Sequence, residues 1–211
     1  MDTIFFDLDG TLTDPKEGII GCIQHALAEM GEDVAAKDEL LWCIGPSLWD
    51  SFEELLGGVE RTHQAMKLYR ERFVEIGMFE NAVYENIPEL LQALHDSGRR
   101  VCLATSKPHV YAGRILEHFK LDAYFDHVFG AELDGTRADK SDLLAYALKQ
   151  SGALTEGAIM VGDRKYDIIG ARANGMTAIG VLYGYGNRNE LEQAKAHHIV
   201  EHPEDLLRLL L

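Results

Sequence analysis

The sequence predicts an α/β protein: a doubly wound parallel sheet with an all-helical segment inserted after the first strand. Along most of the chain, short apolar runs alternate with helical patterns, which is typical of a parallel sheet covered by helices. The exception is the region from Pro15 to Asn81, where apolar residues recur only at helical spacing. We therefore expect a core domain formed by residues 1–14 and 82–211, and a helical domain formed by residues 15–81.

The composition limits the partners of the chain. Of its 211 residues, 46% are hydrophobic, and the formal net charge is -15, which disfavours nucleic acid and anionic membrane surfaces. No apolar run approaches the ~20 residues of a membrane span, and the first predicted strand begins directly after Asp2, so we expect no signal peptide. Three cysteines without metal-type spacing suggest reduced thiols. We expect a cytoplasmic monomer or homodimer.

The predicted core strands are apolar runs bounded by glycine or polar residues. In chain order they are Ile4–Phe6, Arg100–Ala104, His127–Phe129, Ala158–Val161, Thr177–Val181 and an edge strand at Ile199–Val200. Helical patterns separate these runs, and a closing helix is predicted over Pro203–Leu211. Right-handed crossovers would bring the C-terminal ends of all the strands to one edge of the sheet.

The inserted segment carries four helical patterns. Their apolar faces are formed in turn by Ile20, Ile23, Leu27 and Met30; by Leu40, Leu41 and Ile44; by Leu48, Phe52, Leu55 and Leu56; and by Met66, Tyr69, Phe73 and Ile76. Gly45-Pro46 breaks the pattern, and Ser47 is the predicted N-cap of the third helix.

Two carboxylates follow the first strand, where open α/β sheets place their ligands. Asp7 and Asp9 are two residues apart, so in an extended chain their side chains would point to opposite faces. For both to serve one site the chain must turn at Asp9, and Gly10 has the freedom for that turn. A polar turn without a ligand is the alternative interpretation of this stretch alone.

Asp7-Leu-Asp-Gly-Thr-Leu12 resembles the first motif of the haloacid dehalogenase (HAD) superfamily, in the form used by its phosphatases. The superfamily has four motifs in fixed order, and the chain has a candidate for each. The resemblance implies a Rossmann-like core and makes the helical insertion a cap domain over the strand ends. The insertion after the first motif and the Gly184-Tyr-Gly186 turn further resemble the phosphoglycolate phosphatase-like branch.

The second strand runs into Thr105-Ser106-Lys107-Pro108, which resembles the second motif. A hydroxyl group and free backbone N–H groups before a helix can hold phosphate oxygens, so we expect Thr105 and Ser106 to bind phosphate. A plain N-cap for the helix that Pro108 opens is the alternative. Lys107 either adds positive charge to the site or extends into solvent.

Lys140 falls where the third motif has its lysine, and it would bind the phosphate. The family often has proline soon after this lysine, whereas Ser141 follows here and is a predicted N-cap. Arg137 is a rival for the role of Lys140.

Gly162-Asp163, with Asp167 four residues on, resembles the fourth motif. Asp163 would face Asp7, and Asp167 either joins the site or is an ordinary acid at a helix start.

Acids gathered at one edge of a sheet repel one another unless a cation lies among them, and oxygen ligands beside phosphate suit Mg²⁺. The resemblance implies that Asp7 and Asp163 bind Mg²⁺ by carboxylate and Asp9 by its backbone carbonyl. It also implies that Asp7 is the nucleophile, forming an aspartyl-phosphate, and that Asp9 is the general acid and base.

The expected activity is a Mg²⁺-dependent phosphomonoesterase acting on a small phosphorylated metabolite, with phosphoglycolate as the first candidate substrate. A 5′-nucleotidase is the nearest alternative. A sugar-phosphate mutase and a non-catalytic ligand-binding protein remain open. Gly45-Pro46-Ser47 is either a substrate-facing loop or a plain turn.

Overall fold

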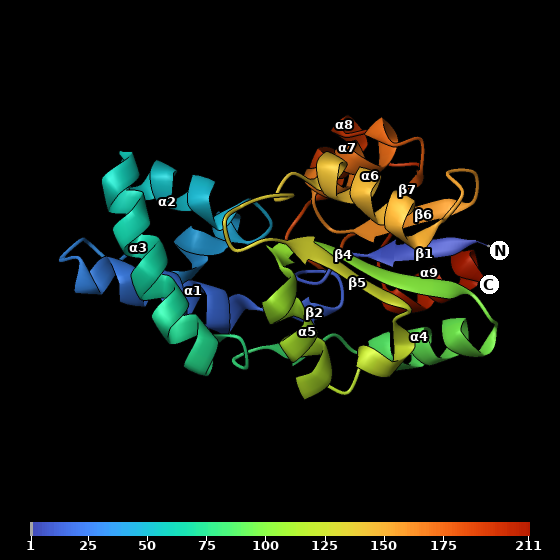
Figure 1. The fold of residues 1–211 in the computed structure, drawn as a ribbon, viewed down its shortest axis with the longest axis horizontal. Coiled ribbons are helices and arrows are strands. Elements are labelled where there is room, and N and C mark those ends of the chain that lie inside the picture. The colour runs from blue at the N-terminus through green and yellow to red at the C-terminus, as the bar shows by residue number, and fades with distance from the viewer. Residues whose placement is uncertain (1) are drawn as a thin grey trace. The chain divides into compact units, whose positions relative to one another are not determined.

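The core of the protein is built on one parallel sheet. The computed structural model describes residues 2–211, and in this part of the chain six strands form the sheet in the order β5-β4-β1-β6-β7-β8 (Figure 1). The strands are β1 (Thr3–Phe6), β4 (Arg100–Pro108), β5 (His127–Ala131), β6 (Ala158–Gly162), β7 (Thr177–Val181) and β8 (His198–Val200). All the predicted strands are present, which confirms the predicted fold class.

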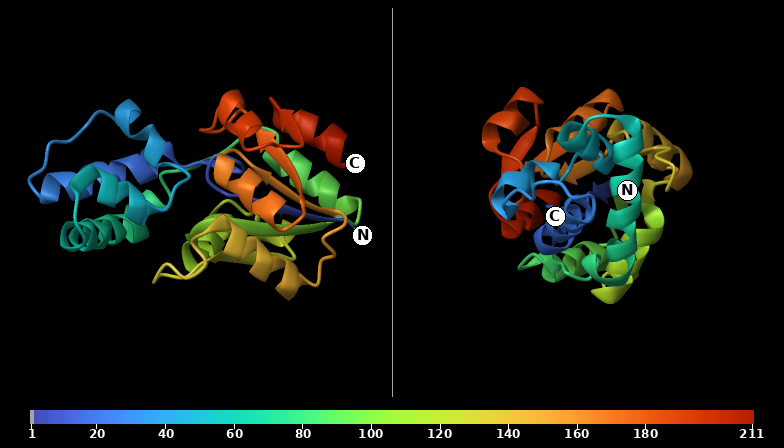
Figure 2. Two further views of the ribbon diagram at one scale, coloured as in Figure 1. Left: turned by 90° about the horizontal axis from the view of Figure 1, so that it is seen from above. Right: turned by 90° about the vertical axis from the view of Figure 1, so that its left-hand side faces the viewer.

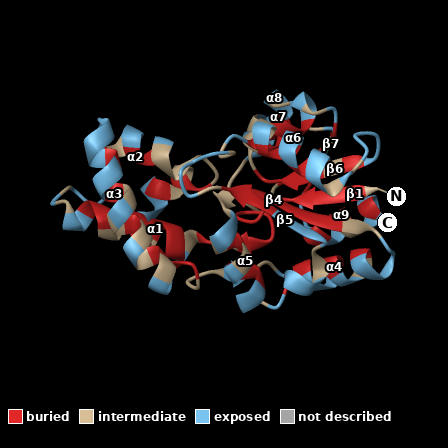
Figure 3. Ribbon diagram, in the orientation of Figure 1, coloured by how far each residue is buried: buried red, intermediate tan, exposed pale blue. Residues whose placement is uncertain are grey.

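β1 occupies the centre of the sheet, between β4 and β6. Phe5 pairs in register with Cys102 on one side and with Met160 on the other. All four β1 residues are buried, as expected for a parallel strand covered on both faces (Figure 3). The chain continues from β1 to β4 on one side and later returns to β6 on the other, so the C-terminal end of β1 lies at the topological switch point of the sheet.

Helices cover both faces of this sheet (Figures 1 and 2). One face is covered by α4 (Ile87–Asp96), α5 (His109–His118) and α9 (Pro203–Leu210). The other face carries α6 (Lys140–Ser151), α7 (Lys165–Ala173) and α8 (Arg188–Gln193). A 3₁₀ turn, η3 (Asp122–Tyr124), precedes β5. Leu143, Leu144 and Ile168 pack with Phe5 in the core.

The chain divides into two compact units. One is the core, formed by the residues up to Asp14 together with Val83–Leu211, and the other is the helical unit, Pro15–Ala82. The chain passes between them at β2 (Thr13–Asp14) and β3 (Ala82–Val83), which pair as a short two-stranded sheet. Among the described residues, no helix combines the length and apolar character that crossing a membrane requires.

The helical unit contains α1 (Lys16–Glu29), η1 (Lys37–Cys43), α2 (Leu48–Leu56), α3 (Val59–Arg72) and η2 (Phe73–Gly77). The second predicted helix is a 3₁₀ helix, and the fourth passes into a π-helix at Phe73. The π-helix ends where the backbones of Gly18 and Gly77 approach so closely that a β-carbon on Gly18 would clash with the Gly77 carbonyl. Ser47 caps α2, with its Oγ accepting from Asp50 N at 3.5 Å, as predicted.

Candidate active site

The segment after β1 turns at the residues that the sequence singled out. The backbone N–H of Asp7 still donates to Val161 O of β6, at 2.9 Å. Gly10 then adopts a φ of 82°, in the left-handed region, and its N–H donates to Thr13 O at 2.8 Å. Asp7 and Asp9 are both buried beside this turn, so the predicted turn is confirmed.

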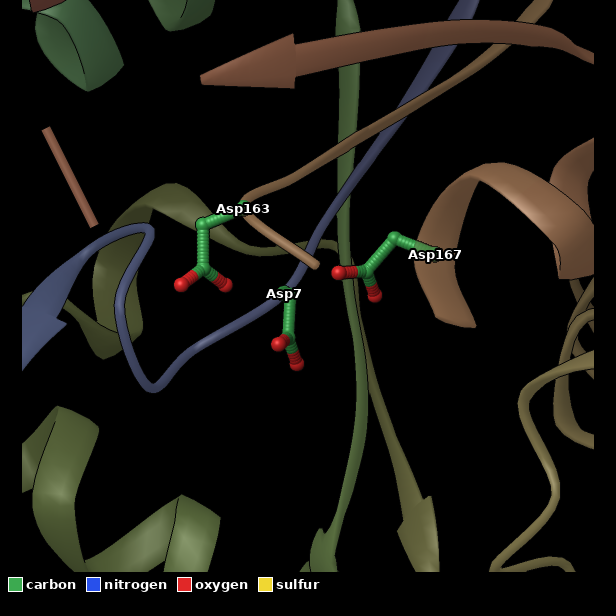
Figure 4. Close-up of side chains that lie close together, drawn as sticks. All are labelled: Asp7, Asp163 and Asp167. Carbon is green, nitrogen blue, oxygen red and sulfur yellow. The ribbon is translucent and has the colours of Figure 1, made fainter. Parts of the chain in front are cut away.

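Three carboxylates converge at the C-terminal edge of the sheet (Figure 4). Asp7 follows β1, Asp163 follows β6, and Asp167 lies in the first turn of α7. One carboxylate oxygen from each lies within 4.8 Å of the others. We call these three residues the acid cluster. All three side chains are buried.

Lys140 joins the acid cluster from the first residue of α6. Its Nζ lies 3.0 Å from Asp7 Oδ1 and 2.7 Å from Asp167 Oδ1, and it donates to the Ala104 carbonyl of β4 at 2.9 Å. Its stem runs against Gly170, where a β-carbon would come within 2.9 Å of Lys140 Cγ. The ammonium group is therefore held at one point by partners from three different elements.

The helix start that positions Lys140 differs from the prediction. Asp139, not Ser141, is the N-cap of α6: its Oδ1 accepts from Ser141 N at 2.8 Å and from Asp142 N at 3.1 Å. The prediction for Ser141 was wrong because an aspartate two residues earlier competes for the same backbone donors. Arg137, the rival of Lys140, pairs instead with Glu132 and lies over the Tyr146 ring at 4.4 Å.

The electrostatics of the acid cluster follow from burial. Burial raises the pKa of Asp163 well above its ordinary value, and the neighbouring Asp167 and Asp7 carboxylates raise it further. Burial also raises the pKa of Asp167, to about 6, although Lys140 opposes the shift. For Lys140, burial lowers the pKa, but the Asp167 and Asp7 carboxylates outweigh this effect and the net pKa is raised. Lys140 therefore stays charged. The raised pKa values of Asp163 and Asp167 show that the lysine charge does not offset the burial of these two carboxyl groups.

Asp9 makes a separate pair with Lys107. Lys107 Nζ lies 2.9 Å from each oxygen of the Asp9 carboxylate, and both side chains are nearly buried. The alternative that Lys107 extends into solvent is therefore wrong. Burial raises the pKa of Asp9, while Lys107 acts in the opposite direction. The Asp9 carboxylate is directed to Lys107 and is not one of the three carboxylates of the acid cluster, which contains Asp167 with the predicted Asp7 and Asp163.

The predicted phosphate-binding residues lie on β4, which continues to Pro108. Thr105 is buried within the strand and its Oγ1 accepts from Lys107 N at 3.3 Å, while Ser106 is half-buried. Pro108 itself occupies the position before α5, so the alternative of Thr105 as the helix cap is wrong.

The acid cluster has the chemistry of a cation site. Asp163 Oδ2 accepts from Tyr185 N at 2.7 Å, but Asp163 Oδ1 is buried and has no hydrogen-bond partner among the described residues. Buried carboxylate oxygens without donors are costly, and hard divalent cations bind through such oxygens. The residues present therefore fit a divalent cation held by Asp7, Asp163 and Asp167.

Sequence reasoning left Asp167 and Lys107 undecided. The position of Asp167 near the start of a helix that follows Asp163 was a signal, because the first turn of that helix lies close to the strand end. Lys107 had no comparable signal, since its partner Asp9 is 98 residues away.

Comparisons with known proteins identify the family. Residues 4–181 match the family model described as haloacid dehalogenase-like hydrolase. A 5′-nucleotidase of Pseudomonas aeruginosa is 45% identical over 207 residues, which cover 98% of this chain and 92% of that protein. The tyrosine-protein kinase PtkA of Mycobacterium tuberculosis is 37% identical over 190 residues, which cover 90% of this chain and 65% of that protein.

A solved structure extends the similarity to the fold. The crystal structure of a "predicted phosphatase" from Clostridium acetobutylicum matches with a TM-score of 0.96 and 42% identity, covering 99% of this chain and 97% of that one. The chain belongs to the haloacid dehalogenase-like hydrolase family. Within that family it is a phosphoric monoester hydrolase.

Proposed function

We propose that the chain hydrolyses small phosphate monoesters with Asp7 as nucleophile, Asp9 as general acid and base, and Mg²⁺ as cofactor. The observation that carries the proposal is the buried contact of Asp7 with Lys140, 3.0 Å away, within a cluster of two further carboxylates. Burying these charged groups costs folding free energy. The arrangement is explained if the site binds a phosphate group and a divalent cation together.

Asp7 would attack the phosphorus atom, forming an aspartyl-phosphate while the bond to the leaving oxygen breaks. Asp9 would give its proton to that leaving oxygen. Asp9 would then take a proton from the water that attacks the phosphorus of the intermediate, which restores the Asp7 carboxylate and releases phosphate. Burial raises the pKa of Asp9, and this favours the protonated form that the first step needs.

The phosphoryl oxygens need positive charge and donors around them. Lys140 would supply charge beside Asp7, and the Thr105 and Ser106 groups at the end of β4 would donate hydrogen bonds. Mg²⁺, held by Asp7, Asp163 and either Asp167 or the Asp9 backbone carbonyl, would neutralise charge on the transferring group. Lys107 would hold Asp9 in place through its two contacts of 2.9 Å.

For the substrate, we place a nucleoside 5′-monophosphate ahead of phosphoglycolate. The sequence pattern alone favoured phosphoglycolate, but the 45% identical relative that covers nearly the whole chain is a 5′-nucleotidase. The helical unit would act as the cap that selects the substrate, with the Gly45-Pro46-Ser47 loop as its specificity element.

A panel of substrates tests this proposal. The purified protein is assayed with p-nitrophenyl phosphate, nucleoside 5′-monophosphates, phosphoglycolate and a phosphotyrosine peptide, each with Mg²⁺ and with a chelator. We expect Mg²⁺-dependent hydrolysis and the highest kcat/KM for a nucleoside monophosphate. A higher kcat/KM for phosphoglycolate would make phosphoglycolate, and not a nucleoside monophosphate, the proposed substrate. No hydrolysis of any ester would overturn the proposal, and tight binding without hydrolysis would indicate a ligand-binding protein.

A further inference from the structure

Two tyrosines fasten the loop after β7 to the loop after β1. The Tyr183 hydroxyl donates to the Thr11 carbonyl at 3.1 Å, and the Tyr185 hydroxyl donates to Asp14 Oδ1. These bonds join residues that are 172 and 171 positions apart in the sequence. The loop after β1 carries Asp7 and Asp9, so it is the loop on which the proposed chemistry depends.

Tyr185 also reaches the acid cluster through its backbone. Its N–H donates to Asp163 Oδ2 at 2.7 Å, while Asp163 Oδ1 has no hydrogen-bond partner among the described residues. One residue therefore touches both sides of the site. Its main chain orients Asp163, and its side chain holds Asp14, the last core residue before the helical unit begins at Pro15.

The backbones of the two loops are in close contact. A β-carbon on Gly184 would clash with the Gly10 carbonyl and would lie 2.5 Å from Asp163 Cβ. Because these backbones are in such close contact, a shift of the Tyr183–Tyr185 segment toward them must displace Gly10, Asp163 or both. The hydroxyl bonds of the two tyrosines fix where that segment lies.

A third tyrosine supports the same loop. Tyr84 N donates to Leu12 O at 3.1 Å, and the Tyr84 ring meets the Tyr183 ring edge-on at 5.2 Å. Burial raises the pKa of all three phenols, and the carboxylates nearby raise it further. The hydroxyls therefore remain protonated donors at neutral pH.

We propose that Tyr185 is a positioning residue, which sets the geometry of the Asp163 carboxylate by tying its own loop to Asp14. The inference rests on the proposed function, in which Asp163 holds the divalent cation. Outer partners of metal ligands typically change metal affinity or activity by 10- to 100-fold when they are lost. Tyr185→Phe keeps the ring and the backbone N–H and removes the hydroxyl with its bonds to Asp14 and to the Tyr84 side chain, so we expect a loss near the lower end, about tenfold.

The test is a double-mutant cycle read by Mg²⁺ titration calorimetry of metal-free protein and by kcat and KM for p-nitrophenyl phosphate. Tyr185→Phe and Asp14→Ala should each weaken Mg²⁺ binding and lower kcat about tenfold, with KM nearly unchanged. Adding Tyr185→Phe to Asp14→Ala should cost little more than Asp14→Ala alone, because the bond between the two side chains is already lost. Asp14→Asn keeps an oxygen acceptor and should restore most of the loss.

Tyr124→Phe is the matched control, because its hydroxyl donates to the exposed Gln92 side chain, at 3.2 Å, and not to the loop after β1. It should bind Mg²⁺ and turn over like the wild type. If the wild type binds Mg²⁺ but Tyr185→Phe changes only the melting temperature, or if the two losses add, the positioning role is overturned and the proposed function stands. If the wild type binds no Mg²⁺ and hydrolyses nothing, the proposed function fails and this inference fails with it.

Discussion

One ion pair of the core and one of the helical unit differ sharply in burial. In the core, Lys140 and Asp7 form an ion pair in which the side chains are only 4% and 9% exposed. In the helical unit, Lys16 and Asp38 form a pair of similar length, 2.8 Å, with side chains 34% and 82% exposed. Exposed pairs contribute little to stability, whereas buried charges are costly and strongly coupled. The difference teaches where to look for chemistry: in the charges that the fold has buried.

If the buried acids do the chemistry, Asp7→Asn should have the largest effect of any substitution. The amide keeps the shape of the side chain but is a very poor nucleophile, so kcat should fall on the order of 10⁴-fold or more. The measurement is steady-state hydrolysis of p-nitrophenyl phosphate, with the melting temperature as the check on folding. Wild-type activity in a folded Asp7→Asn protein would remove Asp7 as the nucleophile.

Lys140→Met should have the next largest effect, on both stability and activity. The substitution leaves Asp7 and Asp167 buried without their shared cation, and breaking a buried pair in this way costs about 3–5 kcal/mol. Urea unfolding of the metal-free protein measures the stability, and kcat should fall about 10²- to 10³-fold.

Lys149→Met, on the exposed side of α6, is the matched control for that experiment. It should change neither quantity. Equal effects of the two substitutions would contradict the special position of Lys140.

The pH dependence of stability should differ between the wild type and Asp167→Asn. In the folded metal-free protein the pKa of Asp167 is raised from 3.8 to about 6, so between these values the native state binds more protons than the unfolded state. The free energy of unfolding contributed by Asp167 should therefore fall as the pH rises through this window. Denaturant unfolding in the presence of a chelator, repeated between pH 3.8 and about 6, measures this free energy for both proteins. If it changed with pH in the same way in both, the raised pKa of Asp167 would be refuted.

Leu48→Arg probes the helical unit, where we expect an effect on selection and not on chemistry. Leu48 follows the Gly45-Pro46-Ser47 loop and is the first residue of α2. The ratio of kcat/KM for a nucleoside monophosphate to that for p-nitrophenyl phosphate should change about tenfold, the size of one altered pocket contact. An equal loss on both substrates would show that this loop does not select.

Lys16→Met should have the smallest effect, since it removes an ion pair whose Asp38 side chain is 82% exposed. Neither kcat nor the melting temperature should change measurably. A clear loss of activity would break the contrast between exposed and buried charges.

The strands and their ends were predictable from the sequence because buried parallel strands are continuous apolar runs and the site residues follow them directly. The convergence of Asp7 and Asp163 was predictable for the same reason. Lys140 lies at the start of α6, well after β5 ends at Ala131, and was predicted from its resemblance to the third motif. The pairing of Lys107 with Asp9 was not, because a lysine side chain can reach solvent or a distant partner, and only the packed structure decides between them.

Competition between neighbouring polar residues was also hidden in the sequence. Asp139 and Ser141 both have oxygens suited to a helix cap, and a shift of two residues moves Lys140 from before the helix to its first turn. The π-helix that begins at Phe73 ends at Gly77, where the Gly18 backbone approaches closely, and no local pattern predicts a contact between residues so far apart in sequence.

The most direct test of the account is to trap the intermediate. Wild-type protein with Mg²⁺ and substrate is quenched in acid within one turnover, and its peptides are analysed by mass spectrometry. The account predicts one phosphoryl group on the peptide that contains Asp7, absent from Asp7→Asn. Phosphoryl transfer to another residue, or single-turnover hydrolysis without any phosphorylated peptide, would contradict it.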